Sequence, residues 1–134
     1  NPDKENNEFI ENIKENVEWL GYKPFMVTHA SDNFEKLYDL AVELLKRGKA
    51  YVCHLSKEDT KIYRENGTDS PYRNRSVEEN LELFENMKNG KYKEKECCLR
   101  MKIDMKHPNT VMRDPAAYRI KYMPHPHAGD KWCI

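Results

Sequence analysis

The chain changes its hydrophobic period once, near Gly90, and this change limits the folds open to it. Before Gly90, apolar residues recur three and four positions apart, which is typical of amphipathic helices. After Gly90, they stand in short runs typical of strands, separated by polar stretches. Helices first and strands last predict an α+β domain with a mostly antiparallel sheet, and not a regular α/β alternation.

Four helices are expected before Gly90, each delimited by local capping signals. Asparagine or serine can accept hydrogen bonds from the free amides of a first helical turn, and glycine can supply a left-handed stop. Proline and acids also suit a first turn, and an acid three residues after serine indicates a capping box. The first helix is expected to begin at Asn1, with Pro2, Asp3 and Glu5 in its first turn, and to stop at Gly21. The second is expected from Ser31 to Gly48. The third is expected to begin at Ser56, and the fourth to run from Ser76 to Asn89-Gly90.

Short apolar runs predict the strands. Two of them interrupt the helices and three follow Gly90, and the polar stretches between the last three are expected to form loops. The expected strands are residues 24–28, 51–53, 97–103, 118–122 and 131–134.

Composition excludes several functional classes. The 134 residues are 38% hydrophobic, which suffices for a core, and no apolar run approaches the roughly 18 residues of a membrane span. The four cysteines form no Cys-x-x-Cys pattern, and Cys97 and Cys98 are neighbours whose side chains point to opposite faces of a strand. Free thiols and no bound metal are expected, with zinc held by cysteines and His54, His125 or His127 as the weaker alternative.

Charge is distributed unevenly although the formal net charge is zero. Residues 1–90 carry 13 Lys+Arg against 18 Asp+Glu, and residues 91–134 carry 10 against 5. A basic C-terminal third is typical of a surface that faces phosphates, and a solvated lysine-rich surface is the alternative.

Catalytic signatures are missing from the chain. It contains no Gly-rich phosphate loop, no Ser-His-Asp order and no carboxylates at metal-binding spacing. His125-Pro126-His127 is the one constellation that resembles an acid-base pair, and alternate residues in a loop are more typical of a surface turn. We therefore assign no catalytic residue.

Five segments in order resemble the middle of a glutaminyl-tRNA synthetase, a class I aminoacyl-tRNA synthetase. They are Asn1-Pro2-Asp3-Lys4-Glu5, residues 70–76 (Ser-Pro-Tyr-Arg-Asn-Arg-Ser), residues 98–105 (Cys-Leu-Arg-Met-Lys-Ile-Asp-Met), Met112-Arg113-Asp114-Pro115 and Asp130-Lys131-Trp132-Cys133-Ile134. The resemblance extends over essentially the whole chain.

The resemblance implies an internal fragment of a cytoplasmic ligase that joins glutamine to its tRNA with ATP. The family's nucleotide-binding signatures are expected before Asn1 and after Ile134, so the ATP site is expected outside this chain and the chain alone is expected to be inactive. Residues 1–32 are expected to belong to the nucleotide-binding Rossmann half, and residues 33–134 to the inserted domain that binds the tRNA acceptor stem.

The implied local function is docking of the acceptor stem. In the family, a loop after the first long strand of the insertion places backbone groups against the first base pairs, and the matching groups here are the carbonyl of Pro108 and the amide of Thr110. Arg119 and Lys121 lie two apart on an expected strand and so share one face. Arg73 and Arg75 flank an expected helix start that adds anion-binding amides. These four residues and Arg64 are the five candidates for phosphate contact.

One segment departs from the family pattern. Many members have a longer hairpin between the matches to Arg64 and Ser70, with a leucine that separates the terminal base pair, whereas residues 65–69 contain no apolar side chain. Two other readings remain open. One is a eukaryotic or archaeal-type glutamyl-tRNA synthetase, which shares the architecture and the pattern at residues 98–105, although residues 50–54 and 131–134 favour the glutamine enzyme. The other is a free-standing module that binds RNA or protein.

Overall fold

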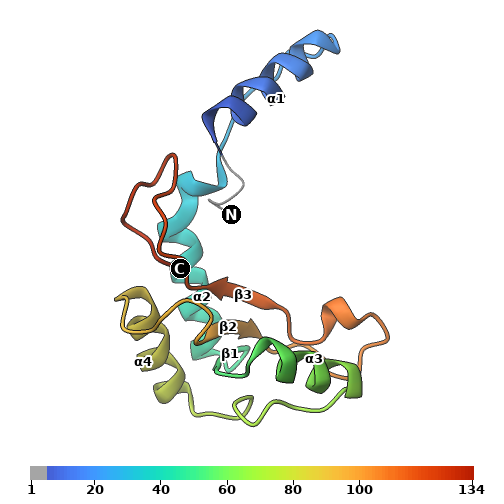
Figure 1. Cartoon of the computed structure of the whole chain (residues 1–134), viewed down its shortest axis with the longest axis vertical. Coiled ribbons are helices and arrows are strands. Elements are labelled where there is room, and N and C mark those ends of the chain that lie inside the picture. Colours follow the sequence, from blue (N-terminus) through green and yellow to red (C-terminus); the bar gives the residue numbers. More distant parts are fainter. Residues whose placement is uncertain (1–5) are drawn as a thin grey trace. The chain divides into compact units, whose positions relative to one another are not determined.

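The computed structural model describes residues 6–134, which divide into two compact units. The first contains the described residues up to Glu35 together with Met123–Trp132, and the second contains Lys36–Tyr122 with Cys133–Ile134. Four α-helices and one three-stranded antiparallel sheet are described (Figure 1), which confirms the mixed α+β class. The assignment of residues 1–32 and 33–134 to two domains stays a prediction.

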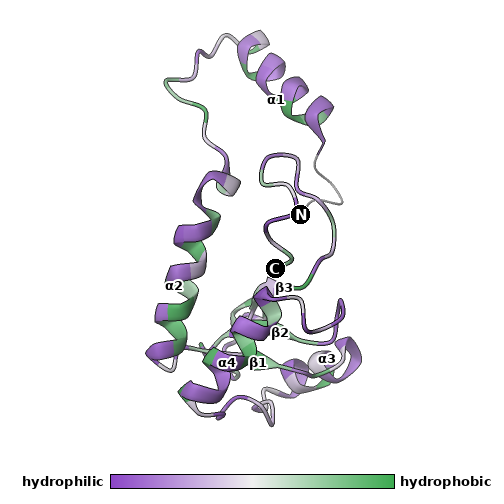
Figure 2. Ribbon diagram, turned by 90° about the vertical axis from the view of Figure 1, so that its left-hand side faces the viewer, coloured by the Kyte–Doolittle hydropathy of each residue, from purple (hydrophilic) through white to green (hydrophobic). Residues whose placement is uncertain are grey.

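In the first unit, α1 spans Asn7–Trp19. The side chain of Asn6 caps it by accepting a hydrogen bond from the Phe9 amide at 2.8 Å, and Gly21 adopts φ +86 at the predicted stop. The predicted cap at Asn1 and its first-turn residues lie outside the described residues. Figure 2 shows hydrophobic and hydrophilic residues alternating along the helix, as the sequence period requires.

The predicted strand at residues 24–28 is wrong, because no strand is described there. Strands are stabilised by pairing with a neighbour, and no other described segment pairs with these residues. The side chain of Phe25 is fully exposed, and those of Met26 and Val27 are more than half exposed. An apolar run alone therefore did not distinguish a strand from an extended exposed segment.

A short 3-10 helix, η2 (Ala30–Asn33), precedes α2 (Phe34–Lys46). Ser31 lies inside η2 and does not cap α2, which corrects the predicted cap. The cap of η2 is His29, whose amide donates to the Asp32 carboxylate at 3.0 Å. The predicted stop of α2 at Gly48 is confirmed by its φ of +64.

The sheet of the second unit has the order β1-β2-β3, with β1 at Ala50–Cys53, β2 at Cys98–Met101 and β3 at Ala116–Arg119. Both pairings are antiparallel, with Val52 opposite Leu99 and Leu99 opposite Tyr118. The predicted strand at residues 51–53 is confirmed by β1, and the predicted strand at residues 97–103 exists in shortened form as β2.

The predicted strands at 118–122 and 131–134 need correction. β3 ends at Arg119, and residues 131–134 form no strand. One backbone bond, from the Lys121 amide to the Cys133 carbonyl at 2.7 Å, is all that pairs the two segments within the described residues. A single bond does not make a ladder, so residues 120–122 and 131–134 form no strand.

Two further helices complete the second unit, α3 (Lys57–Asn66) and α4 (Val77–Lys88). Ser56 caps α3 by accepting from the Asp59 amide at 3.0 Å, and Ser76 caps α4 by accepting from the Glu79 amide at 3.1 Å. Both predicted caps are confirmed. No helix in the described part of the chain has the length and apolar character needed to cross a bilayer.

The core of the second unit lies between the sheet and the helices α2 and α4. A buried side chain, Asn80, joins α4 to β1, because its Oδ1 accepts from the Val52 amide at 2.8 Å. Its Nδ2 donates to the carbonyls of Arg75 and Ser76, so each polar atom of this buried amide is satisfied. The core residues are Ala41, Leu45, Ala50, Val52, Phe84, Met87, Cys97, Leu99 and Ile120.

Candidate nucleic-acid interface

The loop that follows β2 carries the two predicted RNA-reading groups. We call residues 104–113 the reader loop. Local side chains shape it: Asp104 accepts from the Lys106 amide at 2.8 Å, and Asn109 accepts from the Val111 amide at 3.0 Å at the start of the 3-10 helix η3 (Thr110–Met112). Short side-chain acceptors of this kind compete with regular structure and favour tight turns. The loop conformation is therefore locally encoded.

Several backbone groups of the reader loop have no hydrogen-bond partner within residues 6–134, and two of them are the predicted reading groups. They are the Pro108 carbonyl and the Thr110 amide, and both residues are exposed. The neighbouring Asn109 carbonyl, by contrast, accepts from the Met112 amide at 3.0 Å. An exposed acceptor and an exposed donor two residues apart are thus available to an external partner.

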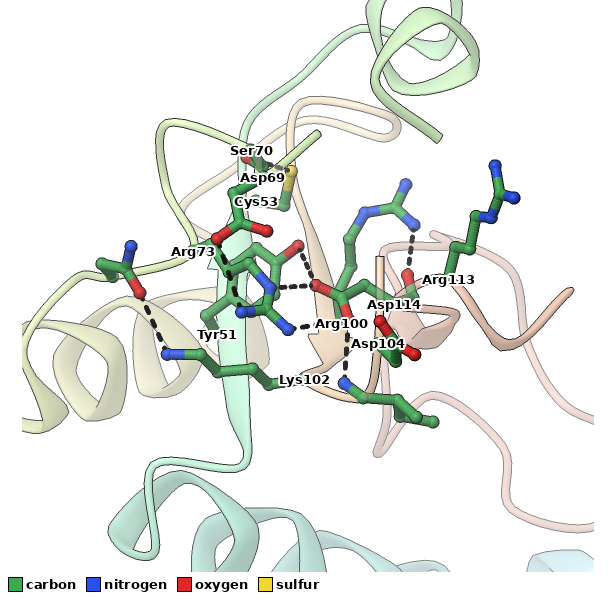
Figure 3. Close-up of polar contacts among 12 residues, drawn as sticks. Tyr51, Cys53, Asp69, Ser70, Arg73, Arg100, Lys102, Asp104, Arg113 and Asp114 are labelled. Carbon is green, nitrogen blue, oxygen red and sulfur yellow. Dashed lines mark hydrogen bonds and ion pairs between the residues drawn. The ribbon is translucent and has the colours of Figure 1, made fainter. Parts of the chain in front are cut away.

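Asp114 anchors the end of the reader loop in the second unit. Its side chain is 1% exposed, and its carboxylate accepts from the Tyr51 hydroxyl at 3.0 Å, from Arg73 Nε at 2.7 Å and from the Ile103 amide at 2.8 Å (Figure 3). Arg100 Nη1 donates to the Asp114 carbonyl at 2.9 Å. Burial and the Asp114 charge raise the pKa of Tyr51, so its hydroxyl remains a donor.

Arg73 is therefore part of a buried ion pair. Its side chain is 14% exposed, and Asp69 lies 3.6 Å from its Nη1. The hydrogen bond to Asp114 is the main cause of the raised pKa of Arg73. A guanidinium held in this way can reach a phosphate only in competition with two carboxylates.

Arg75 also interacts with the chain's own groups. Its Nη1 donates to the Val52 carbonyl and to His54 Nδ1, both at 3.0 Å, and its Nε lies 3.1 Å from a Glu79 carboxylate oxygen. The guanidinium stacks on the Tyr72 ring at 4.4 Å. Burial, and then the Arg75 charge, lower the pKa of His54, which favours the neutral imidazole that accepts this bond.

The pair at the C-terminal end of β3, Arg119 and Lys121, differs from these arginines. Ile120 is buried in the core, as the alternating pattern predicted, and Arg119 is exposed. The Arg119 side chain makes no hydrogen bond or ion pair to any described residue, and Lys121 Nζ lies 3.6 Å from the Glu94 carboxylate. Of the predicted phosphate contacts, Arg119 is the most accessible.

Sequence reasoning missed Arg113, Asp114, Arg100 and Tyr51 as residues that shape this region. The segment Met112-Arg113-Asp114-Pro115 was noted for its resemblance, but nothing local indicates that its charged side chains turn inward. A positive φ of 44 at Asp114 is compatible with the known tolerance of Asp for this conformation. Among the described residues, no three His, Cys, Asp or Glu side chains converge to hold a metal ion.

Comparisons with known proteins agree with the sequence resemblance. The family model described as class I tRNA synthetases (E and Q), catalytic domain, matches residues 1–134. The chain is 58% identical to the probable glutamine–tRNA ligase of Dictyostelium discoideum and 52% identical to the cytoplasmic glutamine–tRNA ligase of Arabidopsis thaliana. It is 53% identical to the glutamine–tRNA ligase of Clostridium kluyveri. These alignments cover 100% of this chain but 17%, 17% and 25% of the respective relatives.

Proposed function

Because the chain belongs to the family of class I tRNA synthetases (E and Q), catalytic domain, we propose that it is part of a glutamine–tRNA ligase. That ligase would join glutamine to its tRNA, with ATP converted to AMP and pyrophosphate. The relatives named above are all glutamine–tRNA ligases, which favours glutamine over glutamate as the substrate. A cytoplasmic location fits the name of the Arabidopsis relative.

Within that protein, we propose that this chain docks the acceptor stem of the tRNA. The observation that carries the proposal is the exposed, unpaired Pro108 carbonyl and Thr110 amide on a loop that the chain holds firmly. The minor groove of A-form RNA is wide and shallow, and it displays base edges and 2′-hydroxyls that backbone groups can read. A carbonyl and an amide together offer one acceptor and one donor to that groove.

Phosphate contacts would orient the stem beside the reader loop. Arg119 is accessible for this role, and Lys121 would exchange its contact with Glu94 for a phosphate. Arg73 and Arg75 enter the proposal as weaker contacts, because a phosphate would compete with their present partners. Arg64 can offer a phosphate only its Nη1, because its Nε and Nη2 already donate to backbone carbonyls.

We propose that the ATP site lies outside residues 1–134 and that residues 1–32 belong to the nucleotide-binding half of the ligase. The large exposed apolar side chains of α1, among them Phe9 and Ile13, suit a helix that packs against further chain. The isolated chain should then show no glutamine-dependent exchange of labelled pyrophosphate into ATP. Exchange above background would contradict this part of the proposal.

Binding of an acceptor-stem minihelix to the 134-residue chain tests the docking function. Replacing both cations, Arg119→Ala with Lys121→Ala, should weaken binding by about 1 kcal/mol or more, while the thermal midpoint changes little because neither side chain is in the core. A large fall in the midpoint with unchanged affinity would show that the pair is structural. Arg47, which pairs with Glu43 on α2, supplies the control Arg47→Ala.

A further inference from the structure

Arg64 and Arg113 join α3 to the reader loop by reciprocal hydrogen bonds. Arg64 Nε donates to the Arg113 carbonyl at 3.0 Å, and Arg113 Nη1 donates to the Arg64 carbonyl at 2.6 Å. The same Nη1 lies 3.1 Å from the Glu65 carbonyl. The carbonyls at the end of a helix lack helical partners and carry partial negative charge, so a guanidinium is well suited to them.

The two guanidiniums also hold the carbonyls that flank the proposed reading groups. Arg113 Nε donates to the His107 carbonyl at 2.7 Å, and Arg64 Nη2 donates to the Thr110 carbonyl. The His107 carbonyl belongs to the peptide bond that leads into Pro108, and the Thr110 carbonyl follows the Thr110 amide. Because peptide units are planar, these bonds fix the backbone on both sides of the Pro108 carbonyl and the Thr110 amide.

A third contact seats the start of the reader loop against α3. Gly67 follows the last residue of α3 with φ +63, and a Cβ there would lie 3.0 Å from the Met105 carbonyl oxygen. The end of α3 therefore touches the loop through its backbone as well as through the two arginines. Arg64 to Gly67 and residues 105–113 form one connected unit.

We propose that Arg64 and Arg113 are positioning residues, which hold the Pro108 carbonyl and the Thr110 amide in the arrangement that the acceptor stem reads. This inference rests on the proposed docking function. It gives Arg64 a different main role from the phosphate contact that its charge predicted, because its Nε and Nη2 face backbone carbonyls. A preorganised reader avoids the ordering cost that a mobile loop would incur on binding.

A phosphate-contact role and a positioning role for Arg64 predict different effects of salt and of substitution by lysine. A lost phosphate contact lowers the slope of log affinity against log salt by about one, and lysine restores most of such a contact because it supplies the charge. Lysine cannot reproduce the planar fork that reaches two carbonyls at once. If Arg64 positions the loop, Arg64→Lys should weaken minihelix binding about tenfold with an unchanged salt slope.

The experiment measures minihelix affinity of the 134-residue chain over a series of KCl concentrations. Arg113→Lys approaches the same loop from the other partner, and the double variant should lose less than the product of the two single effects, since both residues hold one backbone segment. Arg119→Gln serves as the phosphate-contact comparison and should lower the slope. Arg47→Lys is the surface control and should bind as the unsubstituted chain does.

Amide hydrogen exchange supplies a readout that needs no RNA. In Arg64→Lys, exchange of the Met112 and Arg113 amides should become at least about tenfold faster, whereas amides of the β1-β2 pair should stay protected. Unchanged exchange, or wild-type affinity in Arg64→Lys, would overturn the positioning role alone. A lower salt slope in Arg64→Gln, together with affinity largely restored in Arg64→Lys, would show a phosphate contact instead. Failure of the unsubstituted chain to bind the minihelix would overturn the docking function, and the inference with it.

Discussion

The buried carboxylate of Asp114 offers a direct test of how the reader loop is anchored. Asparagine keeps the size of the side chain and tolerates the left-handed conformation that Asp114 adopts at φ 44. Asp114→Asn therefore removes the charge without adding backbone strain. The new amide NH2 also replaces one of the two accepting oxygens. This donor would then face either the donors of Arg73 and Tyr51 or the Ile103 amide, and two donors form no hydrogen bond.

The partners of Asp114 set the size of the effect. Removing one member of a buried ion pair costs about 3–5 kcal/mol, because the other charge is left without compensation. Arg73 retains Asp69 at 3.6 Å and is 14% exposed, so part of its charge stays compensated. We expect the low end, about 3 kcal/mol, which is a large share of the roughly 5–15 kcal/mol that stabilises a typical domain.

Urea unfolding followed by far-ultraviolet circular dichroism measures this loss. Fluorescence is unsuitable, because the two tryptophans, Trp19 and Trp132, both lie in the first unit. Tyr51→Phe is the matched control and should lose about 1.5 kcal/mol, the value of one hydrogen bond to a charged acceptor. The double variant should lose less than the sum, since the Tyr51 hydroxyl has already lost that acceptor. A loss below about 0.5 kcal/mol for Asp114→Asn would refute the anchoring argument.

Three further predictions concern the same unit. Asn80→Asp should lower the free energy of unfolding by about 2–3 kcal/mol in urea titration, because a buried carboxylate would face the carbonyls of Arg75 and Ser76. Gly67→Ala should lose about 1–2 kcal/mol by the same measurement, since its φ is +63 and a Cβ would crowd the Met105 carbonyl. Burial raises the pKa of the Cys97 thiol from 9.0 to about 12, so its contribution to stability is complete below pH 9 and is lost as the pH rises toward 12. Unfolding titrations between pH 8 and 11 should show a smaller decline in Cys97→Ala than in the unsubstituted chain.

Local signals predicted the helices better than the strands. The caps at Ser56 and Ser76 depend on a side chain and an amide three residues away, so the sequence contains the whole interaction. A strand depends on a partner that is distant in sequence. Residues 24–28 have strand composition but pair with no other described segment, whereas residues 116–119 pair with β2 and were only partly included in the expected strand.

The candidate site divides in the same way. The exposure of Arg119 and the burial of Ile120 follow from alternation, which a sequence displays directly. The reader groups at Pro108 and Thr110 were predicted from the family resemblance, because a free carbonyl and a free amide leave no mark on side-chain identity. The bonds between Arg64 and Arg113 join residues 49 positions apart and are visible only after folding.

Formal charge therefore overstates the cationic surface that this chain can offer to RNA. Five of the seven predicted contacts are cations, but Arg64, Arg73 and Arg75 direct guanidinium donors at carbonyls, a carboxylate and an imidazole of the chain itself. Each would have to surrender a hydrogen bond in order to hold a phosphate, and that loss offsets much of the gain. Of the other two cations, Arg119 and Lys121, Arg119 needs no such exchange. On the docking proposal, the arginines thus contribute mainly by fixing the backbone of the reader loop, and recognition of the acceptor stem depends more on backbone geometry than on charge.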